Sequence, residues 1–131
     1  EYHKFDPADP KSHRRSVYRF IVRSQPDPFM TTLDCADSSQ STPKRDETLT
    51  ALQALSLLNN KFTLEMSNRF AAHLQKESKT LPIQIHRAHQ LTTGRPPTAK
   101  EMAALEKFAR QHGLPNLCRV LFNLSEFTYV D

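Results

Sequence analysis

The sequence predicts a mainly α-helical protein, a bundle of about five short helices with an N-terminal extended arm or short β-hairpin. Apolar residues recur at helical spacing through the second half of the chain, which is the main signal for helices. Two threonines are followed three positions later by Gln or Glu, the spacing of a capping box at a helix start. The only two glycines, Gly94 and Gly113, follow helical stretches and are expected to end them.

The chain divides into three segments by composition. Residues 1–15 are interpreted as a linker or connecting arm, because two Asp-Pro pairs and several charges favour turns. Residues 16–46 are expected to form an extended segment and a polar loop. Residues 47–131 are expected to form the helical bundle, so that residues 16–131 make one domain fragment.

The extended segment holds the best strand candidate. Residues 16–24 are rich in β-branched and aromatic residues, and Pro26 and Pro28 close the stretch. Residues 29–33 are a second short extended piece that could pair with the first. Residues 34–46 contain mostly Ser, Asp, Thr and Pro and predict a loop.

The first bundle helix is predicted over residues 51–59, after a capping box formed by Thr50 and Gln53. Leucines lie on several sides of this helix, so it is expected to be the most buried one. The second helix is predicted to face the core with a stripe of residues spaced four apart, namely Phe62, Met66, Phe70 and Leu74.

Three more helices complete the predicted bundle. One begins near Pro82 and ends before Gly94; the next starts at a second capping box, Thr98 with Glu101, and ends at Gly113. The last begins at Pro115 and leaves an apolar tail. The residues expected to face inward are Ile85, Ala88, His89, Leu91 or Thr92, Met102, Leu105, Phe108, Ala109, Leu117, Val120, Leu121 and Leu124.

Charge and hydropathy limit the partners that this chain is expected to have. The net charge of +4 comes from 18 basic and 14 acidic residues that are spread along the chain, so we expect no nucleic-acid partner. No apolar run approaches the length of a membrane-spanning helix, so no membrane insertion is expected. The densest basic stretch marks a possible interface made of Arg19, Arg23 and Tyr18, although arginines that point to solvent or pair with carboxylates explain it better.

No catalytic group, metal site or cofactor is predicted. His86 and His89 could share a helix face, but a zinc site needs further ligands, and His89 lies on the apolar stripe. We therefore expect His89 to be a core histidine with a satisfied hydrogen bond. Cys35 and Cys118 could form a disulfide or remain two small buried thiols, and the sequence leaves both alternatives open.

One polar group is less easily explained, and it is our candidate polar site. It consists of Asp34, Asp37, Arg45 and Arg15. Carboxylates at such spacing could bind calcium or act as acid and base, although the spacing is not that of an EF-hand. We favour the interpretation that they cap turns and pair with the arginines.

Several short motifs in a fixed order resemble a known family. They are Arg14-Arg15-Ser16-Val17-Tyr18, Leu33-Asp34-Cys35-Ala36-Asp37, the stretch from Arg45 to Asn59 with Thr48, Thr50 and Gln53, Gly94-Arg95-x-Pro97 with Glu101, and Leu121-Phe122-Asn123 with Glu126 and Tyr129. Together they resemble the C-terminal half of the planctomycete domain of unknown function 1553. Ala36 and Ala51 depart from that pattern, in which proline is usual, and His89 stands where an aromatic residue is usual. Arg95 is expected to hold a helix end or an acidic residue such as Glu126.

The resemblance implies a setting rather than a reaction. It implies a larger exported protein of the periplasm or cell envelope, whose partners are the remainder of the parent protein and a c-type cytochrome module. We therefore favour a structural or interaction module, and lean against enzymatic activity in this fragment. The alternative is part of a polysaccharide-degrading or cytochrome-coupled enzyme whose main site lies outside it.

Overall fold

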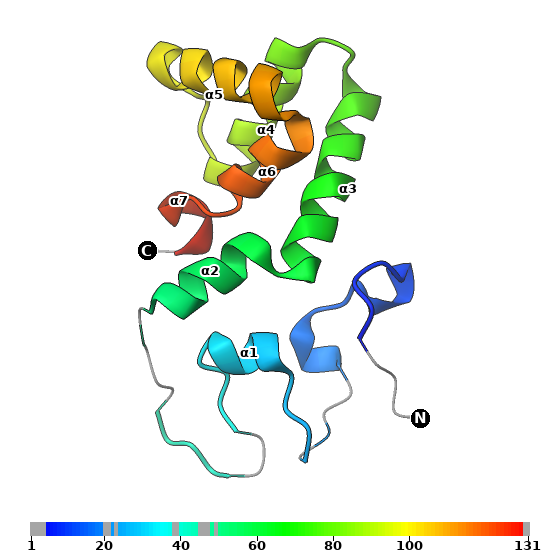
Figure 1. Ribbon diagram of the computed structural model, residues 1–131, viewed down its shortest axis with the longest axis vertical. Coiled ribbons are helices and arrows are strands. Elements are labelled where there is room, and N and C mark those ends of the chain that lie inside the picture. Colours follow the sequence, from blue (N-terminus) through cyan, green and yellow to red (C-terminus); the bar gives the residue numbers. More distant parts are fainter. Residues whose placement is uncertain are drawn as a thin grey trace. The chain divides into compact units, whose positions relative to one another are not determined.

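The computed structural model describes residues 5–19, 22, 24–37, 40–44, 48 and 50–129 (Figure 1). As predicted, this part of the chain is mainly helical, and all its regular elements are helices. The chain forms two compact units, Glu1–Phe62 and Thr63–Asp131, here called the N-terminal unit and the C-terminal unit. None of the helices in the described ranges is long and apolar enough to cross a membrane.

The N-terminal unit is built from short elements, most of which begin at a side-chain cap. They are the 3-10 turns η1 (Pro10–Ser12) and η2 (Ser16–Tyr18) and the helices α1 (Pro28–Thr32) and α2 (Ala51–Asn59). At α1, Asp27 Oδ1 accepts the backbone N–H groups of Phe29 at 2.9 Å and Met30 at 3.1 Å. Pro28 follows as the first helical residue, where its missing N–H costs nothing.

The prediction of two extended pieces is wrong for the residues that the structure describes. Residues 16–18 form a 3-10 turn, and residues 28–32 are helical. The physical reason at α1 is local. The Asp27 carboxylate accepts free N–H groups at the helix start, and Pro28 has no N–H to satisfy, whereas a strand needs a partner strand for its hydrogen bonds. Phe20, Ile21 and Arg23, which belonged to the predicted strand, lie outside the described residues.

Helix α2 has the predicted bounds and capping box, but it is not the most buried helix. Gln53 is its only buried residue, whereas Leu52 is 62% exposed and Leu55 57% exposed. Because apolar residues lie on nearly every side of this helix, their pattern could not indicate which side would face the protein.

The C-terminal unit contains most of α3 (Lys61–Glu77), followed by α4 (Leu81–Thr93), α5 (Ala99–His112), α6 (Leu114–Leu121) and α7 (Ser125–Thr128). Helices α4, α5 and α6 pack against one another, and the short α7 packs on α4 (Figure 1). This arrangement confirms the predicted succession of short helices.

The hydrophobic core lies among these helices. The predicted inward residues Ile85, Ala88, Leu117 and Leu121 are at most 2% exposed, and Ala109 is 5% exposed. Of the two alternatives Leu91 and Thr92, Thr92 is the buried residue and Leu91 lies at the surface. The cluster of buried core residues is Ala71, Leu74, Ile85, Ala88, Ala109, Leu114, Leu117, Cys118 and Leu121.

The buried face of α3 differs from the predicted stripe by one position. Leu74 is buried as expected, but its buried companions are the small residues Thr63, Ser67 and Ala71. Small side chains leave room for a neighbouring segment to approach the helix closely, so they can occupy the most buried side. The bulkier Phe70 packs at the edge of the core, where its ring lies 5.4 Å from that of Phe122.

Helix ends in the C-terminal unit follow the sequence signals closely. Gly94 adopts the left-handed conformation after α4, with φ 75° and ψ −4°, and its N–H donates to Gln90 O at 3.0 Å. Gly113 ends α5 at φ 86°. Thr98 and Glu101 form the predicted capping box.

Candidate functional site

Three acidic and basic side chains from separate elements meet in the C-terminal unit. Arg95 lies in the loop after α4, Glu101 in the first turn of α5 and Glu126 in α7. The Arg95 guanidinium holds both carboxylate oxygens of Glu101, at 3.0 and 2.8 Å, and its Nη2 also donates to Glu126 Oε1 at 3.0 Å. We call this trio the Arg95 clamp. Its contact with Glu126 agrees with the partner that the sequence suggested.

The contacts of the clamp favour the charged forms of Arg95 and Glu101. Hydrogen bonds from Arg95, and then from the N–H and hydroxyl of Thr98, hold the pKa of the Glu101 carboxyl well below its usual range. The pKa of Arg95 is raised above its usual value by Glu101 first and by Glu126 second. A general acid or base needs a pKa near the working pH, so Arg95 and Glu101 are suited to holding elements together rather than to proton transfer.

His89 supports the same loop from inside. Its side chain is buried, and its Nδ1 lies 3.1 Å from the carbonyl oxygen of Arg95. Because that oxygen is an acceptor, Nδ1 carries the proton in this hydrogen bond. This agrees with the prediction of a core histidine with a satisfied hydrogen bond.

A second polar cluster lies in the N-terminal unit, and we call it the Asp34 latch. The Asp34 carboxylate accepts the Thr48 N–H at 2.7 Å, the Thr48 hydroxyl at 2.8 Å and Gln53 Nε2 at 3.0 Å. Asp34 has φ 56°, a left-handed conformation that Asp tolerates better than most residues. The latch joins the two ends of the polar loop to the first turn of α2.

Other members of the predicted polar site lie elsewhere or outside the description. Asp37 is exposed, and its carbonyl accepts the Gln40 N–H at 3.3 Å. Arg15 is exposed at the start of η2. Arg45 lies outside the described residues. Thr48 and Gln53, which share the Asp34 carboxylate, were not placed in this site by sequence reasoning, although both occur in the motifs quoted above.

Of the predicted interface residues, Arg19 has an internal role. Its guanidinium lies 3.5 Å from the centre of the Phe5 ring and 3.4 Å from Oδ2 of Asp27, the residue whose Oδ1 caps α1. Within the described ranges, its buried Nε has no hydrogen-bond partner. Tyr18 is 71% exposed, and Arg23 falls among the residues that the structure does not describe.

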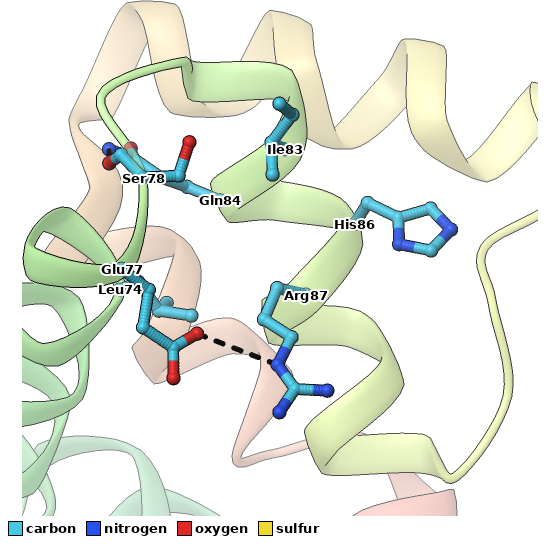
Figure 2. A pocket seen from close by; sticks show the side chains of 7 residues that line it. All are labelled: Leu74, Glu77, Ser78, Ile83, Gln84, His86 and Arg87. Carbon is cyan, nitrogen blue, oxygen red and sulfur yellow. Dashed lines mark hydrogen bonds and ion pairs between the residues drawn. The ribbon is translucent and has the colours of Figure 1, made fainter.

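A shallow hollow lies between the end of α3 and the start of α4 (Figure 2). The hollow is lined by Leu74, Glu77, Ser78, Ile83, Gln84, His86 and Arg87. Arg87 Nε and Glu77 Oε2 form an ion pair at 3.5 Å. Its volume is about 200 Å³. Pockets that enclose a small-molecule ligand usually measure about 300–1,000 Å³, so this hollow is small for a substrate. It contains no member of the predicted polar site.

No group of three or more His, Cys, Asp or Glu side chains among the described residues is placed to hold a metal ion. Cys35 is exposed and Cys118 is buried, and neither forms a disulfide. Burial raises the pKa of the Cys118 thiol to about 12. The expectation of two buried thiols therefore holds for Cys118 but not for Cys35.

The chain is thus a small helical protein in which the Arg95 clamp and the Asp34 latch connect helix ends and loops. The family model described as protein of unknown function (DUF1553) matches residues 2–109, and the chain belongs to this family. No curated protein and no solved structure matches the chain. The match ends within α5, although α6 contributes Leu114, Leu117, Cys118 and Leu121 to the core.

Proposed function

We propose that this chain is a structural and interaction module of a larger exported protein. One observation carries the proposal: polar residues of the family-like motifs fasten the fold internally. Arg95, Glu101 and Glu126 tie three elements of the C-terminal unit together. Asp34 and Gln53 tie the polar loop to α2.

The chemistry of these contacts supports a holding role. In the Arg95 clamp, the guanidinium presents a planar fork to a carboxylate, which favours one geometry and two fixed charges. In the Asp34 latch, one carboxylate accepts three hydrogen bonds at distances up to 3.0 Å, which fixes the position of the polar loop against α2. Neither cluster contributes to the hollow between α3 and α4.

The cellular setting is part of the proposal. We place the larger protein in the periplasm or cell envelope because of the resemblance of the motifs quoted above. The partner is the remainder of the parent protein, and a c-type cytochrome module is a second partner. Fractionation of the source cells with an antibody against this chain tests the compartment, and recovery in the cytoplasmic fraction would contradict it.

The functional test compares the parent protein with a form lacking residues 1–131. We expect the shortened form to unfold at a lower temperature, because it loses a packed partner. We also expect the separate chain to release no reducing sugar from a panel of polysaccharides and to leave the redox state of cytochrome c unchanged. If the chain releases sugar and the double variant Asp34→Asn with Asp37→Asn does not, the chain is part of a polysaccharide-degrading enzyme. If it changes the redox state of cytochrome c, it is part of a cytochrome-coupled enzyme.

A further inference from the structure

Helix α7 is attached to the C-terminal unit through exposed side chains. None of its four residues is buried, and its N-cap residue, Leu124, has an apolar side chain that cannot cap it. The Glu126 side chain, 49% exposed, lies 3.0 Å from Arg95 Nη2. Phe127 is 45% exposed, and the centre of its ring lies 5.0 Å from that of Phe122. An exposed ion pair and one aromatic pair stabilise a contact only weakly, so α7 can detach while the core stays folded.

The surface under α7 is held in place by contacts that do not involve α7. Glu101 binds the Arg95 guanidinium through both carboxylate oxygens, at 3.0 and 2.8 Å, and the buried His89 binds the Arg95 carbonyl oxygen at 3.1 Å. The Phe122 ring stacks on the Phe70 ring of α3, with the ring centres 5.4 Å apart. Arg95 and Phe122 therefore keep their positions when α7 leaves. Such a preformed surface binds a ligand without a cost for ordering its own side chains.

We propose that this surface is a binding site for a short peptide segment of a partner protein in which Glu is followed directly by Phe, and that α7 is a strap that occupies the site until this segment replaces it. We call Arg95, Phe122 and the part of α4 on which α7 packs the α7 site. The inference rests on the proposed function, which gives the chain an interaction role. It adds the surface, the chemistry of the partner segment and a competitor within the chain.

The segment that already occupies the α7 site indicates which chemistry fits it. Arg95 Nη2 donates to both carboxylate oxygens of Glu126, at 3.0 and 3.4 Å, so the site favours a carboxylate and repels a basic side chain. The Phe122 ring gives an aromatic side chain a partner. Glu126 and Phe127 are neighbours in the sequence, so a segment of one helical turn supplies both groups.

The strap also sets how strongly a partner must bind. Residues 122–124 join α6 to α7, and this short connection keeps α7 at a high local concentration beside its site. A partner segment binds only to the fraction of molecules in which α7 has detached, so its apparent affinity falls by that fraction. A segment that makes only the contacts of α7 is therefore excluded, and one that adds further contacts displaces it.

The test is an NMR titration of the whole chain with a peptide of sequence LSEFTY, which corresponds to residues 124–129. Glu126→Gln with Phe127→Ala, here called the open variant, releases the strap. We expect the peptide to bind the open variant with a dissociation constant on the order of 1 mM and to shift the amide signals of Arg95 and Phe122. Binding to the wild type should be weaker by about tenfold or more, because α7 competes for the site.

Two controls separate specific recognition from general stickiness. A peptide with Glu126→Lys should bind the open variant about tenfold more weakly or not at all, because Arg95 repels its ammonium group. The chain variant Ser125→Ala with Tyr129→Ala changes two exposed residues of the same segment but keeps Glu126 and Phe127. It should bind the peptide as weakly as the wild type. Circular dichroism checks that each variant keeps the helical fold.

The other outcomes overturn the proposal in different ways. If the peptide does not bind the open variant, the α7 site does not recognise a separate segment. If it binds the wild type and the open variant equally, it binds elsewhere and α7 is not a competitor. If the Glu126→Lys peptide binds as tightly as the original, the site does not select a carboxylate. If the wild-type chain forms dimers that the open variant abolishes, the occupant is α7 of a second copy.

The proposed function is tested independently by the unfolding temperature of the parent protein with and without residues 1–131. A failed titration with a normal result in that comparison overturns the α7 site alone. An unchanged unfolding temperature contradicts the proposed function whatever the peptide does.

Discussion

Arg95 Nη2 lies 3.0 Å from Glu126 Oε1, although the two residues are 31 positions apart in the sequence. The same guanidinium also holds both oxygens of Glu101, so one side chain connects the loop after α4 with the first turn of α5 and with α7. Helix α7 contains no buried residue; it is attached by this contact, by its packing on α4 and by the ring of Phe127, whose centre lies 5.0 Å from that of Phe122.

Replacing Arg95 by Gln should loosen α7 and lower the temperature of thermal unfolding. The neutral amide of Gln cannot hold two carboxylates. The unfolding temperature of Arg95→Lys should lie between those of the wild type and Arg95→Gln, because an ammonium group keeps the charge but lacks the bidentate fork. Hydrogen exchange at residues 125–129 reports the loosening directly. The control is Arg110→Gln, which removes a cation paired with Glu106 on α5 alone and should leave that exchange unchanged. Equal exchange in Arg95→Gln and wild type would contradict a holding role for the clamp.

The Arg95 clamp should make stability depend on pH in the acid range. The pKa of Glu101 is lower in the folded chain than its ordinary value of 4.5, so between these two values the unfolded state binds more protons. This contribution to stability is therefore fully present above about pH 4.5 and is lost as the pH falls toward the folded pKa. Urea unfolding at a series of pH values measures it, and Glu101→Gln should flatten the curve below pH 4.5. An unchanged slope in that variant would assign the acid sensitivity to other carboxyl groups.

The two thiols should react very differently. Cys35 is exposed, whereas burial raises the pKa of Cys118 to about 12 and blocks access to it. A thiol reagent at neutral pH should therefore label one cysteine quickly and the second only after denaturant is added. Cys35→Ser should abolish the rapid phase. Rapid labelling of that variant would show that Cys118 is accessible in the folded chain.

Helix α6 should be essential to the fold even though it lies beyond the reach of the family match. Leu117 is fully buried in the core, so Leu117→Ala should cost about 2–5 kcal/mol of unfolding free energy. The control, Leu91→Ala, removes a leucine that is 46% exposed and should cost much less. Chemical denaturation measures both. Similar costs for the two variants would contradict the packing of α6 described here.

Gln53 should matter more than an exposed glutamine. Gln53→Ala removes the side-chain partners of Thr50, Asp34 and Thr48, and leaving such groups unsatisfied costs about 1–3 kcal/mol. Gln75, exposed on α3, is the matched control and its replacement by Ala should be close to neutral. Hydrogen exchange in the first turn of α2 should rise only in the Gln53 variant. Unchanged exchange there would contradict the role of Gln53 in holding α2.

The sequence by itself determined where the bundle helices begin and end. Thr50 with Gln53, Thr98 with Glu101, and Gly94 act within one helical turn, so their effect can be read from neighbours in the chain. It also indicated the buried residues Ile85 and Ala88 of α4 and Leu117 and Leu121 of α6, because they recur at helical spacing. At α1, Asp27 and Pro28 also marked a helix start. The β-branched and aromatic residues around them favoured a strand instead, and the prediction followed that signal.

Only the tertiary structure decided which side of α2 faces the protein and which residues the polar clusters contain. The rotation of α2 depends on Gln53 reaching Asp34, 19 positions earlier, and the clamp depends on Arg95 reaching Glu126. Such contacts form between segments that the fold brings together, and their geometry is absent from local periodicity. For the same reason, the sequence could name Asp34 as a site residue, but the pairing of its carboxylate with Thr48 and Gln53 required the folded chain.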